Sequence, residues 1–329
     1  MKSNSIPVDW KKTIQSTVSG HQKFFMTEKT GKIILSGASG LVGSHLLQSL
    51  AGQGLTTLQL VRKTPSGVNQ VSWEPRSAAP VANSAALEGA DAAIHLSGAN
   101  LAGYRWTAAY KRELVSSRVE STQALVRLFG QLRQPPRILL CASATGFYGD
   151  RGDAVVTEAS GQGKGFLADL CAAWDAAANA AREIGMRVVN LRFGAILAPE
   201  DGALGKMLPI FRMGLGGKLG SGKQWMNWIA LADVVRAVEF LMTQPEDGPF
   251  NVVAPNPVTN ADFTQTLCKV LRRPAFLTVP AFALRLAFGE IADEALLTST
   301  RALPERLLKA GFSFEFPALE GALRAMLLR

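Results

Sequence analysis

Three glycines spaced three residues apart, between a short apolar run and a helical pattern, are the feature that most constrains this chain. Residues 33–35 predict a buried strand, and leucines at 46, 47 and 50 recur at helical spacing. A strand, a glycine turn and a helix in that order form the context that a dinucleotide-binding turn requires. Gly37 permits the tight turn, Gly40 lets the backbone approach a pyrophosphate, and Gly43 lets the helix pack closely on the strand. A plain strand-to-helix turn needs one glycine rather than three, so we predict a nucleotide site.

The residues after the second predicted strand indicate which dinucleotide binds. This strand, residues 58–61, ends in Arg62-Lys63, 25 residues after Gly37. NAD-binding folds place a carboxylate near this point for the ribose 2′-hydroxyl, whereas an arginine accommodates the 2′-phosphate of NADP. No Asp or Glu occurs between Gly37 and Glu74. We therefore predict NADP(H); the alternative is that Arg62 and Lys63 belong to a solvated basic loop.

Charge and composition narrow the classes of partner. The 329 residues carry a net charge of +9, but the basic residues are scattered and no run of five occurs. This pattern favours solubility and attraction of anionic ligands over nucleic-acid binding. The longest apolar stretches fall short of about 18 residues, so we expect no membrane span. Three distant cysteines without a CxxC pair predict neither a zinc site nor disulfides, as suits a reducing cytoplasm.

The chain alternates predicted strands and helices up to residue 197, and this predicts an α/β fold with a doubly wound parallel sheet of the Rossmann type. Beyond Ile196 the alternation fails, and glycines and prolines punctuate a mostly helical remainder. We predict a flexible extension over 1–30, a nucleotide-binding domain over 31–197, and a smaller C-terminal substrate-side domain over 198–329. Residues 228–253 are expected to return a helix and a strand to the first domain. Further strands are predicted at 71–73, 91–96, 137–142 and 187–191, and further helices at 106–132 and 165–184.

From residue 31 to the end, the chain resembles the extended short-chain dehydrogenase/reductases of the NAD-dependent epimerase/dehydratase superfamily. More narrowly, it resembles the atypical epimerase family proteins often called YfcH-like. The motifs that carry the resemblance are Gly37-Ala-Ser-Gly-Leu-Val-Gly43, His95-Leu-Ser-Gly-Ala-Asn100, Arg105-Trp106, Ser143 to Gly149, Arg192-Phe-Gly-Ala-Ile-Leu197, Leu215-Gly-Gly-Lys218, Gly220 to Ile229 and Leu303 to Phe312.

The resemblance implies NADP along the carboxyl edge of the sheet. It assigns the 2′-phosphate to Arg62 and the nicotinamide side to Ile196, and it has Glu113 and Arg118 reach in from a long helix. The phosphate turn would comprise Gly37, Ser39, Gly40, Leu41, Val42 and Gly43, and the adenosine and ribose side Leu96, Ser97 and Gly98. Without the resemblance, Glu113 and Arg118 are equally well explained as a surface ion pair.

The usual catalytic pair of this superfamily, Tyr-x-x-x-Lys, is absent. Its spacing places both side chains on one helix face, where the lysine lowers the pKa of the tyrosine. None of the three tyrosines has a lysine four residues later, and Leu170 and Trp174 stand at the expected positions. The remaining catalytic candidates are Ser143 and Tyr148; the alternative is that Ser143 caps a strand end and Tyr148 packs in its loop.

The other polar and aromatic candidates have ordinary structural explanations as well. Asp175, Glu158 and Lys164 are expected to be solvated residues of helices or loops. Trp225, Asn227 and Trp228 line a second pocket wall, or the two tryptophans are interdomain core. His95 lies in an apolar strand pattern and is expected to be a packed residue rather than a metal ligand.

Two functions are consistent with these features. One is an NADP-dependent oxidoreductase or isomerase acting on a small carbonyl or sugar-like substrate; the other is a noncatalytic NADPH-binding sensor. The missing pair favours the sensor, and the retained Ser143 and Tyr148 favour the enzyme. We expect a small-molecule substrate, no nucleic acid, no membrane and no metal. By analogy with extended relatives, the protein is a monomer, or a homodimer formed through helices near residues 115–128 and 167–181.

Overall fold

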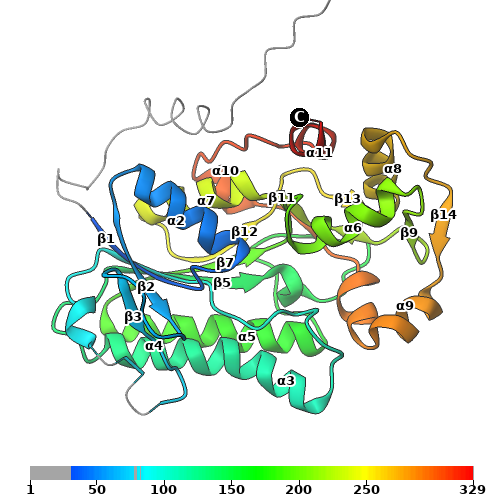
Figure 1. Cartoon of the computed structure of the whole chain (residues 1–329). Coiled ribbons are helices and arrows are strands. Elements are labelled where there is room, and N and C mark those ends of the chain that lie inside the picture. Colours follow the sequence, from blue (N-terminus) through cyan, green and yellow to red (C-terminus); the bar gives the residue numbers. More distant parts are fainter. Residues whose placement is uncertain (1–30, 78–79, 82, 329) are drawn as a thin grey trace, which may run out of the picture.

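The computed structural model describes residues 31–77, 80–81 and 83–328 of the 329. The flexible extension predicted for residues 1–30 lies outside them. Figure 1 shows a central sheet with helices above and below it, and a further group of helices and short strands beyond one end of the strands.

The centre of the fold is a seven-stranded sheet in the order β12-β7-β5-β4-β1-β2-β3, in which every neighbouring pair is parallel. The strand order reverses between β1 and β4, the position where doubly wound sheets bind ligands. The predicted Rossmann-type fold is thereby confirmed. The strands are β1 (Lys32–Ser36), β2 (Thr56–Val61), β3 (Gln70–Ser72), β4 (Ala92–His95), β5 (Ile138–Ala144), β7 (Arg187–Phe193) and β12 (Gly248–Val252).

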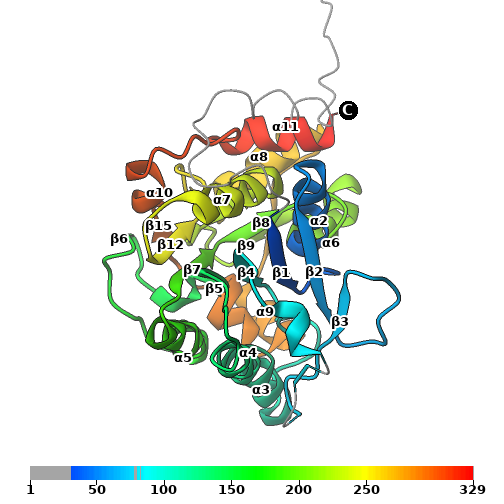
Figure 2. The same ribbon diagram turned by 90° about the vertical axis from the view of Figure 1, so that its left-hand side faces the viewer.

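Alternate residues of the strands serve two cores, one on each face. Ile34 and Leu139 pack with the layer of α4 and α5, whereas Leu35 and Leu140 pack with the layer of α2 and α7. Because both faces are covered, the central strands are largely apolar, and most are recognisable as short apolar runs. Figure 2 shows the same three layers from the side. The helices are α2 (Leu41–Gly52), α4 (Ser121–Phe129), α5 (Phe166–Asn179) and α7 (Leu231–Thr243).

The single helix predicted for residues 106–132 is divided. It begins as α3 (Ala108–Val115), passes through a π-helical turn at Ser116–Glu120, and continues as α4 to Phe129. π-helical turns inside helices are frequent at functional sites. Here the turn carries Arg118, one of the predicted cofactor residues. Shorter helical turns lie at Ser84–Leu87, Thr145–Tyr148 and Ala180–Ile184.

The C-terminal part has its own core, built by Leu204, Phe211, Trp228 and Phe263 among others. It is mainly helical, as predicted, but it also contains short strand pairs that the sequence pattern does not reveal. Its helices are α6 (Gly202–Arg212), α8 (Asn260–Leu271), α9 (Ala281–Phe288), a π-helical turn at Ala292–Leu296, α10 (Glu305–Lys309) and α11 (Leu319–Leu327). The strand pairs are β6 (Val155–Val156) with β15 (Arg301–Ala302), β8 (Ala195–Leu197) with β11 (Trp228–Ala230), β9 (Gly217–Leu219) with β14 (Leu277–Val279), and β10 (Trp225–Met226) with β13 (Val258–Thr259).

Candidate functional site

The glycine turn has the geometry of a phosphate-binding turn. Gly37 has φ +76°, and a Cβ there would lie 2.8 Å from the carbonyl carbon of Leu96. A Cβ on Gly43 would lie 2.1 Å from the carbonyl oxygen of Gly37, so only glycine lets α2 approach the turn. The Cβ position of Gly40 meets no atom closer than 3.4 Å. The backbone at the start of α2 is therefore open to a ligand, and its first N–H groups and positive dipole end favour an anion.

The predicted adenosine side meets this turn directly. The loop after β4 begins at Leu96, whose backbone touches Gly37, and it continues through Ser97 and Gly98. A Cβ on Gly98 would lie 3.3 Å from the guanidinium carbon of Arg118, so this glycine lets Arg118 rest against the backbone. The fold thus brings the glycine turn, Leu96–Gly98 and Arg118 together, although they are far apart in sequence.

Arg118 is a half-buried cation without a carboxylate partner. Its Nη2 donates to the carbonyl oxygen of Ala99 at 2.9 Å, and its guanidinium carbon lies 5.2 Å from the ring centroid of Trp174. Burial lowers its pKa. Among the residues that the structure describes, Arg118 forms no ion pair. A desolvated cation held beside an anion-binding turn is suited to an anionic ligand.

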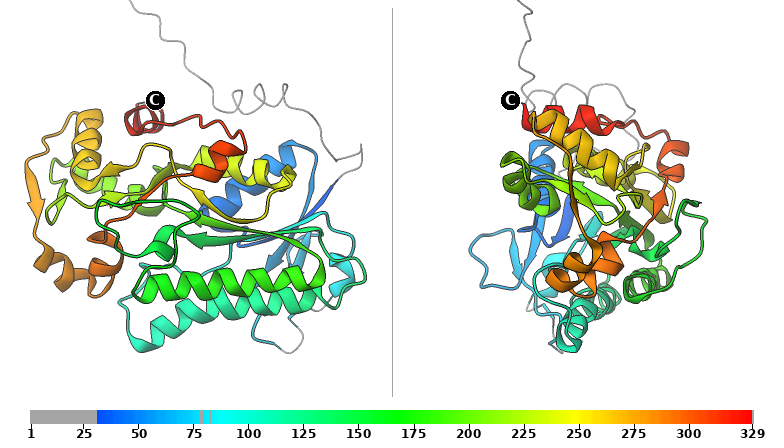
Figure 3. Two further views of the ribbon diagram at one scale, coloured as in Figure 1. Left: turned by 180° about the vertical axis from the view of Figure 1, so that it is seen from behind. Right: turned by 90° about the vertical axis from the view of Figure 1, so that its right-hand side faces the viewer.

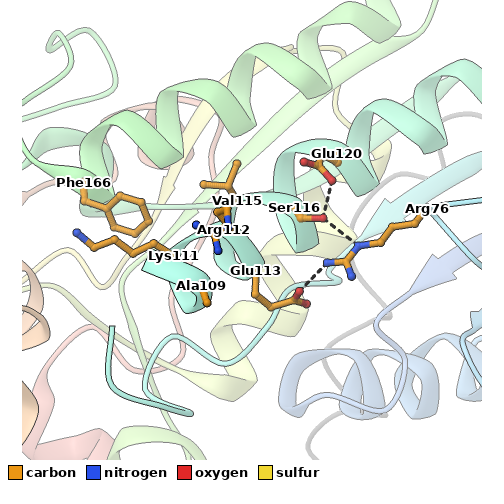
Figure 4. Close-up of a pocket in the computed structure, with 9 residues that line it drawn as sticks. All are labelled: Arg76, Ala109, Lys111, Arg112, Glu113, Val115, Ser116, Glu120 and Phe166. Atoms are coloured by element: carbon orange, nitrogen blue, oxygen red, sulfur yellow. Dashed lines mark hydrogen bonds and ion pairs between the residues drawn. The ribbon is translucent and has the colours of Figure 1, made fainter. Parts of the chain in front are cut away.

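Glu113 occupies a different environment, shown in Figure 4. Its carboxylate lies 2.5 Å from the guanidinium of Arg76, whose Nε also donates to Ser116 at 3.1 Å. These residues border an open depression of about 630 Å³ along the outer face of α3. Glu113 and Arg118 are therefore not a surface ion pair with each other. Sequence patterns missed Arg76, because its loop lies 37 positions before Glu113.

The remaining predicted cofactor residues lie around the same edge. Arg62 follows β2, the parallel neighbour of β1; it is exposed and forms no ion pair with any described residue. Ser39 and Gly40 are exposed in the turn, and Leu41 and Val42 begin α2. Ile196 lies on β8, and its carbonyl oxygen and the Leu41 side chain are both within 4 Å of the Cβ position of Gly202. Ile196 is therefore placed beside the first turn of α2.

Tyr148 is enclosed in a buried polar network. Its side chain is fully buried; its hydroxyl donates to Oδ1 of Asn251 at 2.7 Å and accepts from Nη1 of Arg192 at 3.0 Å. Burial raises the pKa of this hydroxyl. Arg192 also donates from Nε and Nη2 to Oδ2 of Asp175, at 3.1 and 2.8 Å. This arrangement favours the alternative explanation for Tyr148, a packed residue whose hydroxyl is already bonded.

Two polar oxygens beside this network have no hydrogen-bond partner apart from each other in the described structure. They are Oγ of Ser143, near the end of β5, and Oδ1 of Asp175, on α5; both residues are buried. Burial raises the pKa of the Asp175 carboxyl, and this outweighs the lowering by Arg192 and by a hydrogen bond with the Ser143 hydroxyl. Buried polar oxygens of this kind are normally hydrogen-bonded, and here each oxygen has the other for a partner.

The sequence predicts that Asp175, Glu158 and Lys164 are solvated, and the structure agrees only for Lys164. The prediction is wrong for Asp175 and Glu158, since both are buried. Oε1 of Glu158 accepts the backbone N–H of Asn251 at 3.0 Å and that of Arg306 at 3.3 Å, so this carboxylate ties two segments together. Lys164 is exposed and borders a second cavity of about 140 Å³ between the loop after β5 and the π-helical turn Ala292–Leu296.

The other residues singled out are structural. Trp174, at the expected lysine position, donates its Nε1 to Thr122 at 3.1 Å. Trp228 is fully buried in the C-terminal core, which agrees with the alternative that it is a core residue and not part of a pocket wall. Asn227 accepts the Ala302 N–H at 2.9 Å, and Trp225 donates its Nε1 to Asp153 at 2.9 Å. His95 is packed, with Nδ1 2.5 Å from the Ser36 hydroxyl.

The three cysteines are unpaired and buried. Within residues 31–77, 80–81 and 83–328, no cluster of His, Cys, Asp and Glu is suited to hold a metal ion. In the same ranges no helix has the length and apolarity needed to cross a membrane.

A parallel sheet with a glycine turn at its switch point defines the class of nucleotide-binding Rossmann proteins. Comparison with known families makes this specific: residues 33–253 match the NAD dependent epimerase/dehydratase family. Residues 279–326 match a domain of unknown function, DUF1731. The chain belongs to the NAD dependent epimerase/dehydratase family. The narrower YfcH-like grouping stays a prediction.

Individual relatives extend over most of the chain. The epimerase family protein Mb2239 of Mycobacterium bovis is 42% identical over 292 residues, which cover 88% of this chain and 96% of that protein. The epimerase family protein SDR39U1 of Bos taurus is 33% identical over 301 residues, 90% of this chain and 99% of that protein. The crystal structure of human SDR39U1 (isoform 2) with NADPH has a TM-score of 0.82 and 31% identity, and it covers 90% of this chain and 98% of that chain.

Proposed function

We propose that this chain binds NADP(H) and acts as an oxidoreductase or isomerase on a small carbonyl or sugar-like substrate. The observation that carries the cofactor is Arg118, a half-buried cation without an ionic partner beside the open glycine turn. The NADPH in the human SDR39U1 structure supports the same choice. A reducing, cytoplasmic location and a monomeric or homodimeric state belong to the proposal too.

In this proposal the first turn of α2 holds the pyrophosphate, Arg62 the 2′-phosphate, and Arg118 a further polar group of the cofactor. Ile196 borders the nicotinamide end, and Glu113 contributes to the adenosine side only if the cofactor reaches the depression where Glu113 pairs with Arg76. The bound cofactor supplies or accepts a hydride. The chain must then orient the substrate and hold the accompanying proton.

Ser143 and Asp175 are the residues best suited to that proton. Their oxygens lie near each other with no other hydrogen-bond partner, and burial raises the pKa of Asp175. We propose that the Ser143 hydroxyl donates a hydrogen bond to the substrate carbonyl and that Asp175 supplies or accepts the proton that accompanies hydride transfer. Arg192 holds Asp175 through Nε and Nη2, and the Tyr148 hydroxyl accepts from its separate Nη1.

The binding test is a titration with NADPH and with NADH, followed by nicotinamide fluorescence. Arg118→Met is expected to weaken NADPH binding at least tenfold and to change the stability of the free protein by less than about 1 kcal/mol, because no ion pair is broken. Arg62→Glu is expected to weaken NADPH but not NADH. The exposed Arg127→Met on α4 is the control. Unchanged NADPH affinity in both site variants would refute the assignment of the cofactor contacts.

Turnover distinguishes Ser143 from Tyr148. With NADPH and a library of small carbonyl compounds, Ser143→Ala is expected to lower kcat at least tenfold with unchanged stability. Tyr148→Phe is expected to retain most of kcat and to lower the free energy of unfolding by about 1–3 kcal/mol, because Asn251 and Arg192 lose a buried partner. If Tyr148→Phe abolished turnover and Ser143→Ala did not, Tyr148 rather than Ser143 would be the group that handles the proton.

The alternative is a noncatalytic NADPH sensor, and the enclosed hydroxyl of Tyr148 favours it. Its signature is tight NADPH binding without oxidation of NADPH by any carbonyl compound in the library. Substrate-dependent oxidation that Ser143→Ala abolishes supports the enzyme instead.

A further inference from the structure

The end of the molecule beyond the sheet exposes an unusual number of large apolar side chains. Two segments, residues 202–223 and 269–289, hold seven of the twelve large hydrophobic residues that are exposed in the described structure. Phe276, Phe282 and Leu286 are 77%, 71% and 75% exposed. The other four are Ile210, Met213, Leu215 and Phe288. Isolated apolar residues on a surface need no explanation, but their concentration at one end of a protein marks an interaction surface.

The fold joins these two segments into one surface. β9 from the first segment pairs in parallel with β14 from the second, with Leu277 opposite Gly217. The turn at Gly214 approaches the ring of Pro274, since a Cβ there would lie 3.7 Å from Cδ. The right-hand view of Figure 3 looks onto this end, with α8, α9 and the chain between them facing the viewer. We call it the basic apolar end.

Basic residues outnumber acidic ones in this surface. The two segments contain eight lysines and arginines and no Asp or Glu, and the exposed Asp201 and Glu290 flank them directly. Only Lys269 and Arg285 form an ion pair with a described residue, through Glu320 and Asp293. Arg212, Arg272 and Arg273 are exposed and have no such partner, and the same holds for Lys206, Lys218 and Lys223, of which Lys218 is half-buried. The β9–β14 pairing brings the segment that carries Arg212 and Lys218 beside the segment that carries Arg272 and Arg273.

We propose that the basic apolar end is a docking surface for an anionic membrane, to which the protein binds peripherally, in contrast to the expectation from the sequence that no membrane is a partner. Phe282 and Leu286 lie four residues apart on one face of α9, with Arg285 between them. Apolar side chains that enter the acyl boundary, next to arginines at the level of the headgroups, are the arrangement by which proteins lie on a membrane without spanning it.

The positive charge of the surface favours an anionic membrane over a second copy of the chain as its partner. In a symmetric dimer the same patch meets itself, so its unpaired cations would face those of the other copy. Like charges brought together across an interface are strongly unfavourable. A surface of anionic lipid headgroups supplies the missing negative charge, and its acyl chains supply the apolar contact.

The test is co-sedimentation of the full-length protein with vesicles of phosphatidylcholine alone, or of phosphatidylcholine with phosphatidylglycerol. We expect binding to the anionic vesicles, at least tenfold weaker binding to the neutral ones, and loss of binding as salt rises. The variant R212Q/R272Q/R273Q is expected to lower the partition coefficient roughly fivefold for each charge removed. The variant F282S/L286S is expected to lower it at least tenfold.

Matched controls lie elsewhere on the surface. Arg127→Gln removes an exposed charge from α4, and Val68→Ser removes a 99% exposed apolar side chain; both should bind vesicles like the wild type. All variants carry surface changes, and their NADPH titrations and melting curves verify folding. Anionic vesicle binding that survives either multiple variant overturns the proposal, as does binding to neither vesicle. A dimer that depends on Phe282 and Leu286, seen by analytical ultracentrifugation without vesicle binding, overturns it in favour of a second copy.

Discussion

Replacing Gly43 by alanine is expected to lower the free energy of unfolding by at least about 3 kcal/mol and to weaken NADPH binding more than tenfold. The new methyl carbon would lie 2.1 Å from the carbonyl oxygen of Gly37 and 2.9 Å from Cα of Ala38. Both neighbours are backbone atoms, so no side-chain rotation relieves the clash. α2 must then move away from β1, and the N–H groups of its first turn move with it.

Gly52 provides a matched control in the same helix. No atom lies within 4 Å of its Cβ position, so Gly52→Ala is expected to leave NADPH binding unchanged and to stabilise the protein by up to about 1 kcal/mol. Urea denaturation measures both stabilities, and nicotinamide fluorescence measures binding. If Gly43→Ala matched Gly52→Ala in stability, the close approach of α2 to the turn would not exist in solution.

The sheet was predictable because its signals are local. Most of its strands contain an apolar run flanked by turn residues, and the glycine spacing places the β1–α2 turn. The short strands β9 and β14 were not predicted. They are three residues long and pair across nearly sixty positions of sequence, so neither shows a period that a pattern can detect. The π-helical turn at Ser116–Glu120 was also not predicted, because it interrupts the α-helical hydrogen-bond pattern without a proline or glycine that would mark it in the sequence.

Part of the candidate site was also predictable from local sequence. The glycine motif indicated the phosphate turn and the end of β2 indicated Arg62, because doubly wound folds use these two positions to bind the dinucleotide. The partners of side chains were not accessible to sequence reasoning. Arg192 on β7 reaches Asp175 on α5, and Arg118 in the π-helical turn lies over the ring of Trp174 on α5. Such pairs depend on how layers pack, which the order of residues along one element does not reveal.

Acid is expected to destabilise this protein through His95. The imidazole is fully buried, between the hydroxyls of Ser36 and Ser121, and burial lowers its pKa from 6.5 to about 4. Above pH 6.5 neither the folded nor the unfolded state binds the proton. Between pH 6.5 and about 4 the unfolded state binds it and the folded state does not. The free energy of unfolding therefore falls as pH drops through this window, by about 1.4 kcal/mol per pH unit and about 3 kcal/mol in all.

Urea denaturation at pH 7 and pH 4.5 measures this loss, and His95→Gln isolates it. Burial raises the pKa of Asp175 and of Glu158, and these groups oppose the acid loss, so the informative quantity is the difference between variant and wild type. His95→Gln is expected to be less stable at pH 7 but to lose about 2–3 kcal/mol less than the wild type on acidification. His45→Gln, which removes a partly exposed histidine, is expected to retain the wild-type loss. Equal acid losses in His95→Gln and the wild type would show that water or a proton reaches this imidazole in the folded state.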